Sequence, residues 1–489
     1  MERFDAAVVG AGVLGSFAAR ALTALDISVL VLEAGEDVCT GVTKANTGIV
    51  YTGMDTRPGT LKTELCVRAN RDFGALCAEL DVRFSRCGSL MVSCGPRADA
   101  VLRERLERGV ENGVPGLRLL DRDEVLEMEP RLTPDVTLGL YAPGTGAVDP
   151  WELGIAAFEN ARANGADFRF NEEVTRMERT GEGYLLTTPA GQYAARAVVN
   201  CAGLSAAAVR EYTKTPAVRI FPTAGDYLVL DDTRRGFVSH VIFHEPEAKE
   251  KGLTLVPTVD GNLLIGPTER ARESAPDGAT AREGLEALYA LCARIVPTLP
   301  LDETIRRFAA LRPNPFHVRE EKGVWVPEKR SINSFTMLSE DGLISLMGIK
   351  TPGLTCAAEL GRWAAAEAAG VLGNPGPNRD FDPRRRGIRR AHGLPEAERA
   401  ALAAADPDYG EIVCHCRDVT RAEVLEAIRR GAVTLDGVKR RTGAGMGRCQ
   451  GARCLLPVLE AIAAERGVPA AEVTKDGGAS WMVTSDGTV

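Results

Sequence analysis

Ala6-Ala7-Val8-Val9-Gly10-Ala11-Gly12-Val13-Leu14-Gly15 joins a short apolar run to a glycine-rich turn. A helical pattern of apolar residues follows over 17–25, and a second apolar run over 28–33 ends in an acidic residue. The order strand, glycine turn, helix, strand is typical of the first unit of a doubly wound α/β fold that binds a dinucleotide. A glycine-rich turn without a ligand is the alternative interpretation.

The glycines of this turn have separate predicted roles in nucleotide binding. Gly10 allows the tight turn, Gly12 lets the backbone approach a pyrophosphate, and Gly15 lets the helix pack on the strand. The N-terminus of the following helix would then face the phosphates, where its amides and dipole favour negative charge. Glu33, about 20 residues further on, is placed to accept a hydrogen bond from a ribose hydroxyl.

The composition is that of a globular protein with several domains. The chain has 489 residues, which predicts two to four domains, and a net charge of −8, which does not suggest nucleic acid binding. Its 12 cysteines are too few for a disulfide scaffold at this length. Neither a signal peptide nor an apolar run of about 18 residues is visible, so we expect no transmembrane segment. We expect a cytoplasmic protein that could still associate with a membrane through a partner.

Periodicity and turn residues indicate mixed α/β structure over most of the chain. Strands are expected over 174–188, 197–203 and 342–348, and a strand-rich stretch over 221–272 suits an antiparallel sheet. Helices are expected over the ranges 150–164, 281–296 and 357–369. Repeated Pro, Gly and Arg over 374–386 indicate the exit from the large domain, and a loose polar tail is expected over 475–489.

Four cysteines in the C-terminal part form a predicted metal centre, namely Cys414, Cys416, Cys449 and Cys454. Such short, fixed spacings of soft ligands in a chain with intracellular features indicate metal binding. The first pair encloses one residue and the second encloses four. Zinc sites more often have two-residue gaps, so these spacings favour an iron–sulfur cluster over zinc. Thr420 and Glu423 form a capping-box pattern, which predicts a helix directly after the first pair.

Several separated segments resemble the D-amino-acid-oxidase-like flavoprotein superfamily, over about residues 4–370. The chain is most similar there to the branch containing FAD-dependent glycerol-3-phosphate dehydrogenases and L-2-hydroxyglutarate oxidases. The segments are Ala45–Lys62, Gly146–Pro150, Asn200–Leu204, Val256–Asn262, Ile265–Thr268 and Gly348–Thr355.

This resemblance implies a Rossmann-type FAD domain with an inserted antiparallel-sheet substrate domain. The FAD part would be discontinuous, over about 1–80, 145–215 and 335–375, and the substrate part would cover about 81–144 and 216–334. A linker would follow over 376–410, then an iron–sulfur domain over 411–470 and a tail over 471–489.

The resemblance also implies which residues hold FAD. Thr43, Asn46 and Thr47 would approach the flavin or its pyrophosphate, Val174 would face the adenine side, and Ala202 and Gly203 would lie in the second glycine turn. The loop Gly348–Thr355 would lie along the isoalloxazine ring and would contribute Gly348, Lys350, Gly353, Leu354 and Thr355.

Residues 411–470 closely resemble the small bacterioferritin-associated-ferredoxin-like [2Fe-2S] domain. This resemblance rests on the cysteine spacing and on the run Asp436–Arg448 before the second pair. It implies that all four cysteines ligate one cluster, with Lys439 and Arg448 offsetting the charge of the thiolates.

The implied reaction is oxidation of a secondary alcohol on a small anionic substrate. Arg312, in Ala310-Leu311-Arg312-Pro313, resembles the substrate-binding arginine of glycerol-3-phosphate dehydrogenases, and Lys350 occupies the family's position for a lysine near the ring. His244 is the candidate base, and Arg57 and Lys62 are weaker candidates near the flavin entrance. The plainer alternatives are an ordinary ion pair for Arg312, a solvated loop residue for Lys350 and a structural histidine for His244.

We therefore expect a glycerol-3-phosphate dehydrogenase that passes electrons through FAD and a [2Fe-2S] cluster to a partner protein subunit or a quinone. An L-2-hydroxyglutarate or amino/imino-acid dehydrogenase on the same scaffold is one alternative, and an electron-transfer subunit is another.

Overall fold

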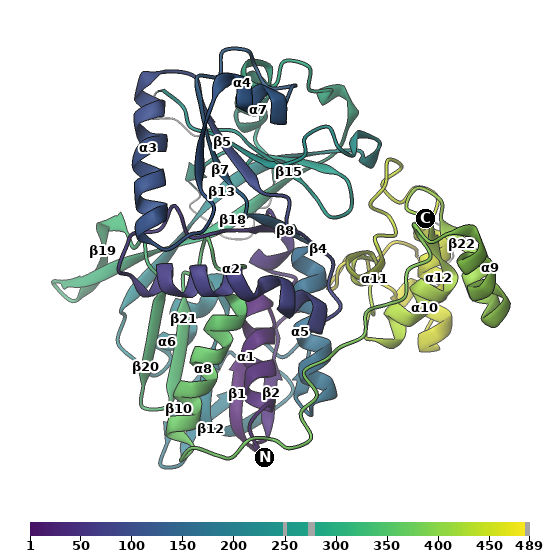
Figure 1. Cartoon of the computed structure of the whole chain (residues 1–489). Helices are drawn as coiled ribbons and strands as arrows, with labels where there is room; N and C mark the ends of the chain where they lie inside the picture. Colours follow the sequence, from purple (N-terminus) through teal and green to yellow (C-terminus); the bar gives the residue numbers. More distant parts are fainter. Residues whose placement is uncertain (248–251, 272–278, 485–489) are drawn as a thin grey trace.

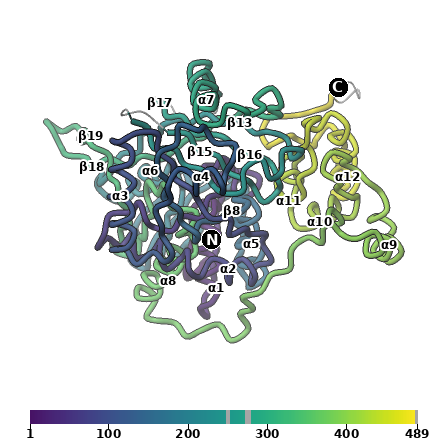
Figure 2. Tube along the Cα trace, turned by 45° about the horizontal axis from the view of Figure 1, so that its top comes forward, coloured from purple at the N-terminus to yellow at the C-terminus, as the bar shows by residue number. Residues whose placement is uncertain are grey.

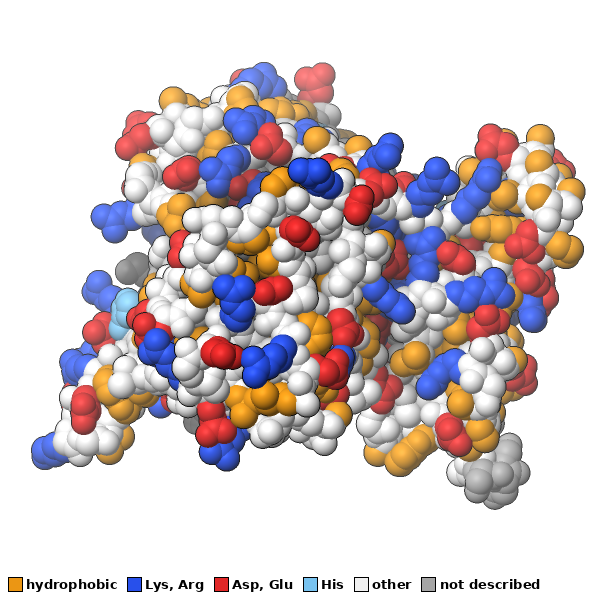
Figure 3. Space-filling model, turned by 90° about the horizontal axis from the view of Figure 1, so that it is seen from below, with side chains coloured by type: hydrophobic (Ala, Val, Ile, Leu, Met, Phe, Trp, Pro, Cys, Tyr) orange, Lys and Arg blue, Asp and Glu red, His pale blue; other side chains and the backbone are white. Residues whose placement is uncertain are grey.

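The computed structural model describes residues 1–247, 252–271 and 279–484. Figure 1 shows a lower body that contains both N-terminal and later strands, an upper body built on a second sheet, and a group of C-terminal helices at their side. Over the described ranges, no helix is both long and apolar enough to cross a lipid bilayer. Figure 3 shows acidic and basic side chains interspersed over the face that it displays.

The lower body is a sheet with parallel strands at its centre. The strand order is β10-β11-β12-β1-β2-β9, and β21 joins β12 while β20 pairs with β21. The pairs β1–β2, β1–β12, β2–β9 and β12–β21 are parallel. Its strands are β1 (Glu2–Val9), β2 (Val29–Leu32), β9 (Asp167–Arg169), β10 (Arg176–Thr180), β11 (Gly183–Thr187), β12 (Gln192–Asn200), β20 (Thr336–Glu340) and β21 (Leu343–Met347).

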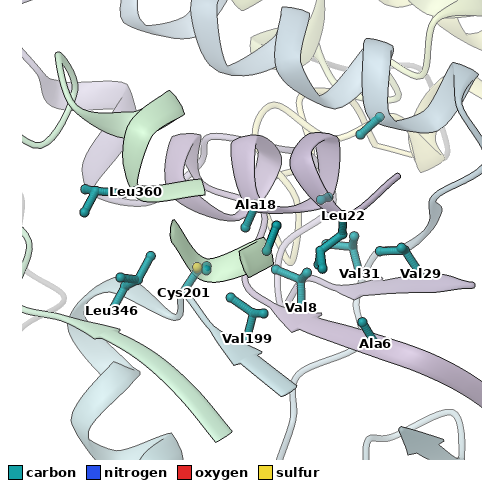
Figure 4. Close-up of a cluster of buried hydrophobic side chains, with 14 of the residues drawn as sticks. Ala6, Val8, Ala18, Leu22, Val29, Val31, Val199, Cys201, Leu346 and Leu360 are labelled. Atoms are coloured by element: carbon teal, nitrogen blue, oxygen red, sulfur yellow. The ribbon is translucent and has the colours of Figure 1, made fainter. Parts of the chain in front are cut away.

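Helices cover this sheet and close a hydrophobic core. Helix α1 (Val13–Thr23) packs against α5 (Pro150–Ala163) and α8 (Ala357–Val371). Figure 4 shows Val8, Val31 and Val199 of the strands pointing toward Ala18 and Leu22 of α1, and all five residues are fully buried. This burial fixes the glycine turn between β1 and α1 at the carboxyl end of the parallel strands, where α/β sheets bind ligands.

The upper body is a largely antiparallel sheet in the order β19-β18-β13-β16-β15-β14-β5-β7-β6, with β17 on β13 and one parallel pair between β14 and β5. Its strands come from two separated stretches of chain. They are β5 (Ser89–Ser93), β6 (Arg118–Asp121), β7 (Leu138–Ala142), β13 (Val218–Leu230), β14 (Val241–His244), β15 (Thr254–Pro257), β16 (Leu263–Ile265), β17 (Arg270–Ala271), β18 (Thr304–Glu321) and β19 (Val324–Ser331).

Short elements join the two bodies. A small sheet pairs β8 (Gly146–Val148) with β3 (Ile49–Val50) and β4 (Phe84–Ser85), and α2 (Leu61–Glu79) lies beside it. The remaining helices of the bodies are α3 (Pro96–Glu111), α4 (Arg122–Met128), α6 (Ala206–Glu211) and α7 (Arg282–Ile295).

The segment after α8 is attached to the lower body. Figure 2 shows it running along the outside of that body before it reaches the C-terminal helices. Asn378 donates its backbone N–H to the carbonyl of Ala24, and Arg385 forms a buried ion pair with Glu159 at 2.7 Å. The predicted linker therefore includes a packed strap, and it also contains α9 (Glu396–Ala405).

The C-terminal domain consists of short strands and helices around its own core. Its elements are β22 (Ile412–Cys414), β23 (Val419–Thr420), α10 (Arg421–Arg429), α11 (Leu435–Thr442) and α12 (Leu455–Arg466). The capping box predicted for Thr420 and Glu423 is present at the start of α10. The prediction of a loose tail is wrong for 475–484, because Asp476 forms ion pairs with Arg440 and Lys44. Residues 485–489 lie outside the described part of the chain.

Candidate active site and iron–sulfur centre

A cavity of about 1430 Å³ lies between the two bodies. The carboxyl ends of β1, β2 and β12 line it from the lower body, and β13, β14 and β18 line it from the upper body. The position at the ends of parallel strands follows from the doubly wound order. The cavity therefore brings the predicted nucleotide site and the predicted substrate residues together.

The glycine turn forms the nucleotide end of the cavity. Gly10 has a φ of +94°, and a Cβ added there would lie 2.8 Å from the carbonyl oxygen of Cys201. A Cβ on Gly15 would lie 1.8 Å from the carbonyl oxygen of Gly10, so only glycine allows this helix to pack on the turn. The Thr43 hydroxyl accepts a hydrogen bond from the backbone N–H of Val13 at 3.1 Å, which orders the start of α1.

Glu33 lies at the end of β2 and lines the same cavity. Its carboxylate accepts hydrogen bonds from the backbone N–H groups of Ala11 at 2.6 Å and Gly35 at 2.8 Å. Burial raises the pKa of Glu33, and these amides partly oppose that effect. Glu33 therefore ties the glycine turn to the loop after β2, beside the predicted ribose position.

Most of the predicted cofactor-binding residues line the cavity: Gly10, Gly12, Glu33, Thr43, Asn46, Thr47, Val174, Ala202, Gly203, Lys350, Gly353 and Leu354. Gly15, Gly348 and Thr355 do not line it. A Cβ on Gly348 would lie 2.5 Å from the Pro315 ring, so this glycine permits close packing between the bodies. The Thr355 hydroxyl accepts from the backbone N–H of Tyr51 at 3.0 Å and thereby supports the cavity wall.

Positive charge gathers at the other end of the cavity. Arg312 and Lys350 both line it, and Arg312 lies 3.5 Å from Glu269. Lys350 donates to the side-chain oxygen of Asn314 at 3.2 Å. Burial lowers the pKa of Lys350, and repulsion by Arg312 lowers it further, against the opposing attraction of Glu269. A guanidinium and an ammonium group in one pocket suit a carboxylate or phosphate ligand.

His244 lines the cavity, and Lys62 contacts one of its lining residues. His244, at the end of β14, is 7% exposed and lines the cavity. Lys62 is 8% exposed, and its Nζ donates to the carbonyl oxygen of Asn333, a cavity residue, at 3.4 Å. Burial and then repulsion by Lys350 lower the pKa of Lys62. Arg57 does not line the cavity; its carbonyl oxygen accepts from the hydroxyl of Thr60, the N-cap residue of α2.

Two polar residues of the cavity were missed in the sequence. Asn314 lines it and holds Lys350, and it lies two residues after Arg312 in β18, so the two side chains share one face of the strand. The two-residue spacing from Arg312 is the sequence feature that could have identified Asn314 as a residue of the site. Tyr227 also lines the cavity, and burial raises its pKa to about 12. Its position in the middle of β13 gave no local indication of a site.

The four predicted metal ligands come together as two pairs. Cys414 interacts with Cys454, and Cys416 interacts with Cys449, so that each thiol shifts the pKa of its neighbour. The Cys454 thiol lowers the pKa of Cys414 to about 6, and the backbone N–H groups of Gly445 and Arg417 act in the same direction. Within the described residues, no three His, Cys, Asp or Glu side chains converge on a single ion. Two pairs of thiols beside backbone amides suit a two-iron cluster with two thiolates on each iron.

The donor sets therefore fit both implied cofactors. Side chains at Gly10 and Gly12 would fill the turn that a pyrophosphate approaches, since a Cβ on Gly12 would lie 3.3 Å from the Thr43 hydroxyl. The cavity is lined both by this turn and by the loop 349–354, and its volume is about 1430 Å³, so the two expected ends of a flavin dinucleotide site belong to one space. Within each pair one thiol, Cys414 or Cys449, has a lowered pKa and its neighbour, Cys454 or Cys416, has a raised pKa, because the neighbouring thiol interacts with the first as a hydrogen-bond donor. Each pair therefore favours a thiolate on one of its two sulfurs.

Comparisons with known proteins agree with this geometry. The family described as "FAD dependent oxidoreductase" matches residues 5–367, and the "BFD-like [2Fe-2S] binding domain" matches residues 412–464. The chain is 37% identical to the glycerol 3-phosphate dehydrogenase of Caloramator mitchellensis over 483 residues, with 98% of each chain covered.

More distant similarities cover a smaller share of the chain. The chain is 29% identical to the mitochondrial L-2-hydroxyglutarate dehydrogenase of Homo sapiens over 281 residues, which covers 54% of this chain and 60% of that protein. The FAD-bound L-alpha-glycerophosphate oxidase of Mycoplasma pneumoniae superposes with a TM-score of 0.70 at 23% identity, covering 78% of this chain and 98% of that one. The predicted fold class and cofactors are confirmed. The chain belongs to the FAD dependent oxidoreductase family and joins that module to a C-terminal BFD-like [2Fe-2S] binding domain.

Proposed function

We propose that this enzyme oxidises sn-glycerol 3-phosphate to dihydroxyacetone phosphate and passes the electrons through FAD and the [2Fe-2S] cluster to a partner protein or a quinone. The observation that carries the proposal is the group of cations at the substrate end of the cavity. Arg312, Lys350 and the nearby Lys62 carry three positive charges, and Glu269, which attracts Arg312 and Lys350, offsets one of them, so this group of four side chains has a surplus of positive charge. The near-complete coverage of a relative named glycerol 3-phosphate dehydrogenase supports a phosphate as the ligand.

The residues of the cavity have distinct proposed roles. The Arg312 guanidinium provides a planar fork of donors for the phosphate, and Lys350 provides a second cation that Asn314 holds in place. His244 is the proposed acceptor of the proton from the substrate hydroxyl, because it lines the same cavity and a neutral imidazole can act as a base near neutral pH.

The cofactors supply the redox chemistry, with FAD as a two-electron acceptor of hydride and the cluster as a one-electron carrier. The chain contributes the surroundings of both groups. The glycine turn and Thr43 hold the nucleotide end, and the amides of Gly445 and Arg417 stabilise thiolate at Cys414. A one-electron centre beside a two-electron centre suits delivery to a protein or quinone acceptor.

L-2-hydroxyglutarate is a second candidate substrate. Several relatives named L-2-hydroxyglutarate dehydrogenase match over about half of the chain, including the human protein at 54% of this chain. A dicarboxylate would also be attracted by Arg312 and Lys350. That match covers 54% of this chain, whereas the match to the relative named glycerol 3-phosphate dehydrogenase covers 98%, so glycerol 3-phosphate remains the leading proposal.

The test is anaerobic mixing of the reconstituted enzyme with each candidate substrate while the visible absorbance of the flavin is followed. We expect sn-glycerol 3-phosphate to bleach the flavin and L-2-hydroxyglutarate to leave it oxidised. Bleaching by neither substrate would contradict the proposal. A Cys449→Ser variant should lose the cluster absorbance and keep flavin bleaching by substrate. Loss of bleaching in that variant, with FAD still bound, would contradict electron flow from flavin to cluster.

A further inference from the structure

The loop after β2 lies between the cofactor cavity and the C-terminal domain. Residues 34–46, here named the nucleotide loop, line the cavity through Ala34, Gly35, Thr40, Gly41, Val42, Thr43, Ala45 and Asn46. The intervening side chains of Glu36, Asp37 and Lys44 do not line the cavity, and all three contact the C-terminal domain. One face of the loop thus forms the FAD site and the other face meets the iron–sulfur domain.

Asp37 makes the strongest of these contacts. It is 1% exposed, and its carboxylate accepts hydrogen bonds from Arg441 Nη1 at 2.7 Å and Nη2 at 2.8 Å, and from Arg440 Nη2 at 3.1 Å. The fork of Arg441 therefore binds both carboxylate oxygens. Arg440 and Arg441 are 6% and 5% exposed, so the three charges form a buried cluster at the domain boundary, here named the Asp37 cluster.

The C-terminal segment holds the loop at two more points. Asp476 pairs with Lys44 at 3.2 Å and with Arg440 at 2.9 Å, which links it to the Asp37 cluster. The backbone N–H of Gly478 donates to Glu36 at 3.1 Å. A Cβ on Gly477 would lie 3.0 Å from the Glu36 side chain, so this close approach depends on glycine.

The contacts reach the glycine turn through one residue. Cys39 is fully buried with a φ of +61°, and its backbone N–H donates to the carbonyl of Ala11 at 3.0 Å. Asp37 is two residues earlier, and its side chain also accepts from the N–H of Val38 at 2.8 Å. A shift of Asp37 would therefore be transmitted to the turn that faces the pyrophosphate.

We propose that Asp37, Arg440 and Arg441 are positioning residues for FAD, so that the iron–sulfur domain completes the FAD site from outside the cavity. A buried ion pair gives little net stability, because the attraction between its charges offsets their desolvation, but it fixes one arrangement of the groups. Here that arrangement spans two domains and sets the nucleotide loop. Affinity for FAD is therefore a property of both domains, although no described residue of the C-terminal domain lines the cavity.

The test measures FAD binding to full-length Asp37→Asn and Arg441→Gln variants. The apoprotein is titrated with FAD, and the quenching of flavin fluorescence gives Kd, while iron content and cluster absorbance report on the C-terminal domain. We expect Kd for FAD to rise about tenfold or more in both variants, while the cluster is retained. This is the size of effect seen when residues that orient the ligands of a metal site are replaced. Arg429→Gln is the matched control, because Arg429 pairs with Glu465 within the C-terminal domain and is 57% exposed.

An unchanged Kd for FAD in Asp37→Asn or Arg441→Gln would overturn the proposal. An equal rise in Arg429→Gln would also overturn it, because the effect would not be specific to the nucleotide loop. If both of these variants fail to fold, FAD binding to the Asp476→Asn variant tests the proposal instead. Its side chain is 30% exposed and it contacts the loop at Lys44, so a several-fold rise in Kd supports the proposal and a wild-type Kd overturns it.

Discussion

The Asp37 cluster and the cations at the substrate end of the cavity are both buried groups of charge. They differ in how far their charges are neutralised by ion-pair partners. Asp37 receives three hydrogen bonds from Arg440 and Arg441, and Arg440 has a second carboxylate partner in Asp476. The cations at the substrate end of the cavity, Arg312, Lys350 and the nearby Lys62, have fewer partners. Over the described residues, Glu269 pairs with Arg312 and attracts Lys350, and no carboxylate forms an ion pair with Lys62.

The difference in compensation separates a structural role from a binding role. A compensated buried cluster has satisfied partners and holds domains in place. An uncompensated group of cations keeps its unfavourable charge because a ligand completes it. The comparison therefore predicts opposite responses to mutation: loss of folding or FAD affinity at the Asp37 cluster, and loss of substrate binding with little cost in stability at the cavity cations.

The largest effect is expected from Asp37→Asn on stability. Removal of the carboxylate charge leaves Arg440 and Arg441 buried without their main partner. We expect the free energy of unfolding to fall by about 3–5 kcal/mol, the usual cost of breaking a buried ion pair. Urea unfolding followed by circular dichroism measures the change. A loss no larger than that of Arg429→Gln would remove the distinction between the two groups of charge.

Arg312→Ala should affect substrate binding next most strongly. Loss of a charge-assisted hydrogen bond costs about 2 kcal/mol, so KM for sn-glycerol 3-phosphate should rise roughly thirtyfold while FAD stays bound. Steady-state kinetics with an artificial electron acceptor gives KM. Arg319→Ala is the control on the same strand, since Arg319 is 66% exposed and pairs with Glu321. An unchanged KM for Arg312→Ala would mean that Arg312 is not the anion anchor.

The two groups of charge should also respond differently to pH. Burial and Arg312 lower the pKa of Lys350, so its positive charge is lost at a lower pH than for an ordinary lysine. KM for the anionic substrate should therefore rise as pH increases through the pKa of Lys350. In the Lys350→Arg variant, KM should rise less as the pH increases over this range, because arginine stays protonated. If KM of the Lys350→Arg variant rises with pH as in the wild-type enzyme, a group other than Lys350 causes the pH dependence.

The Asp37 cluster responds to acid instead. Burial would raise the pKa of Asp37, but attraction by Arg441 and Arg440 outweighs burial and lowers it. Ionised Asp37 therefore stabilises the folded protein fully above about pH 3.9, the pKa of an aspartate in the unfolded chain. This stabilisation is lost as the pH falls through the lower pKa of Asp37 in the folded protein. FAD affinity should thus stay constant over the alkaline range in which KM rises. A parallel fall in FAD affinity over that range would contradict the separation.

The sequence predicted features whose residues are close together in the chain. The roles of Gly10 and Gly15 and the capping box of Thr420 and Glu423 follow from local spacing, and each is present in the structure. The pairing of Asp37 with Arg441 joins residues 404 positions apart, and neither has a distinctive local pattern. The same reason explains why the polar segment around Asp476 was expected to be loose. The sequence gives the number of acidic and basic residues, but it does not indicate which of them form ion pairs with each other.

The smallest effect is expected from Lys62→Met, and it gives the sharpest contrast with Asp37→Asn. Lys62 contacts the Phe335 ring at 5.6 Å and the Asn333 carbonyl, and no described carboxylate forms an ion pair with it. Burial disfavours its charge, so an apolar side chain of similar length should leave the thermal unfolding temperature unchanged or raise it. Loss of one nearby cation should weaken substrate binding by about 0.5–1 kcal/mol, or roughly two- to fivefold in KM. Differential scanning fluorimetry and steady-state kinetics measure both quantities. A destabilised variant with unchanged KM would place Lys62 with the structural charges, and the surplus of positive charge at the substrate end would then reduce to Arg312 and Lys350.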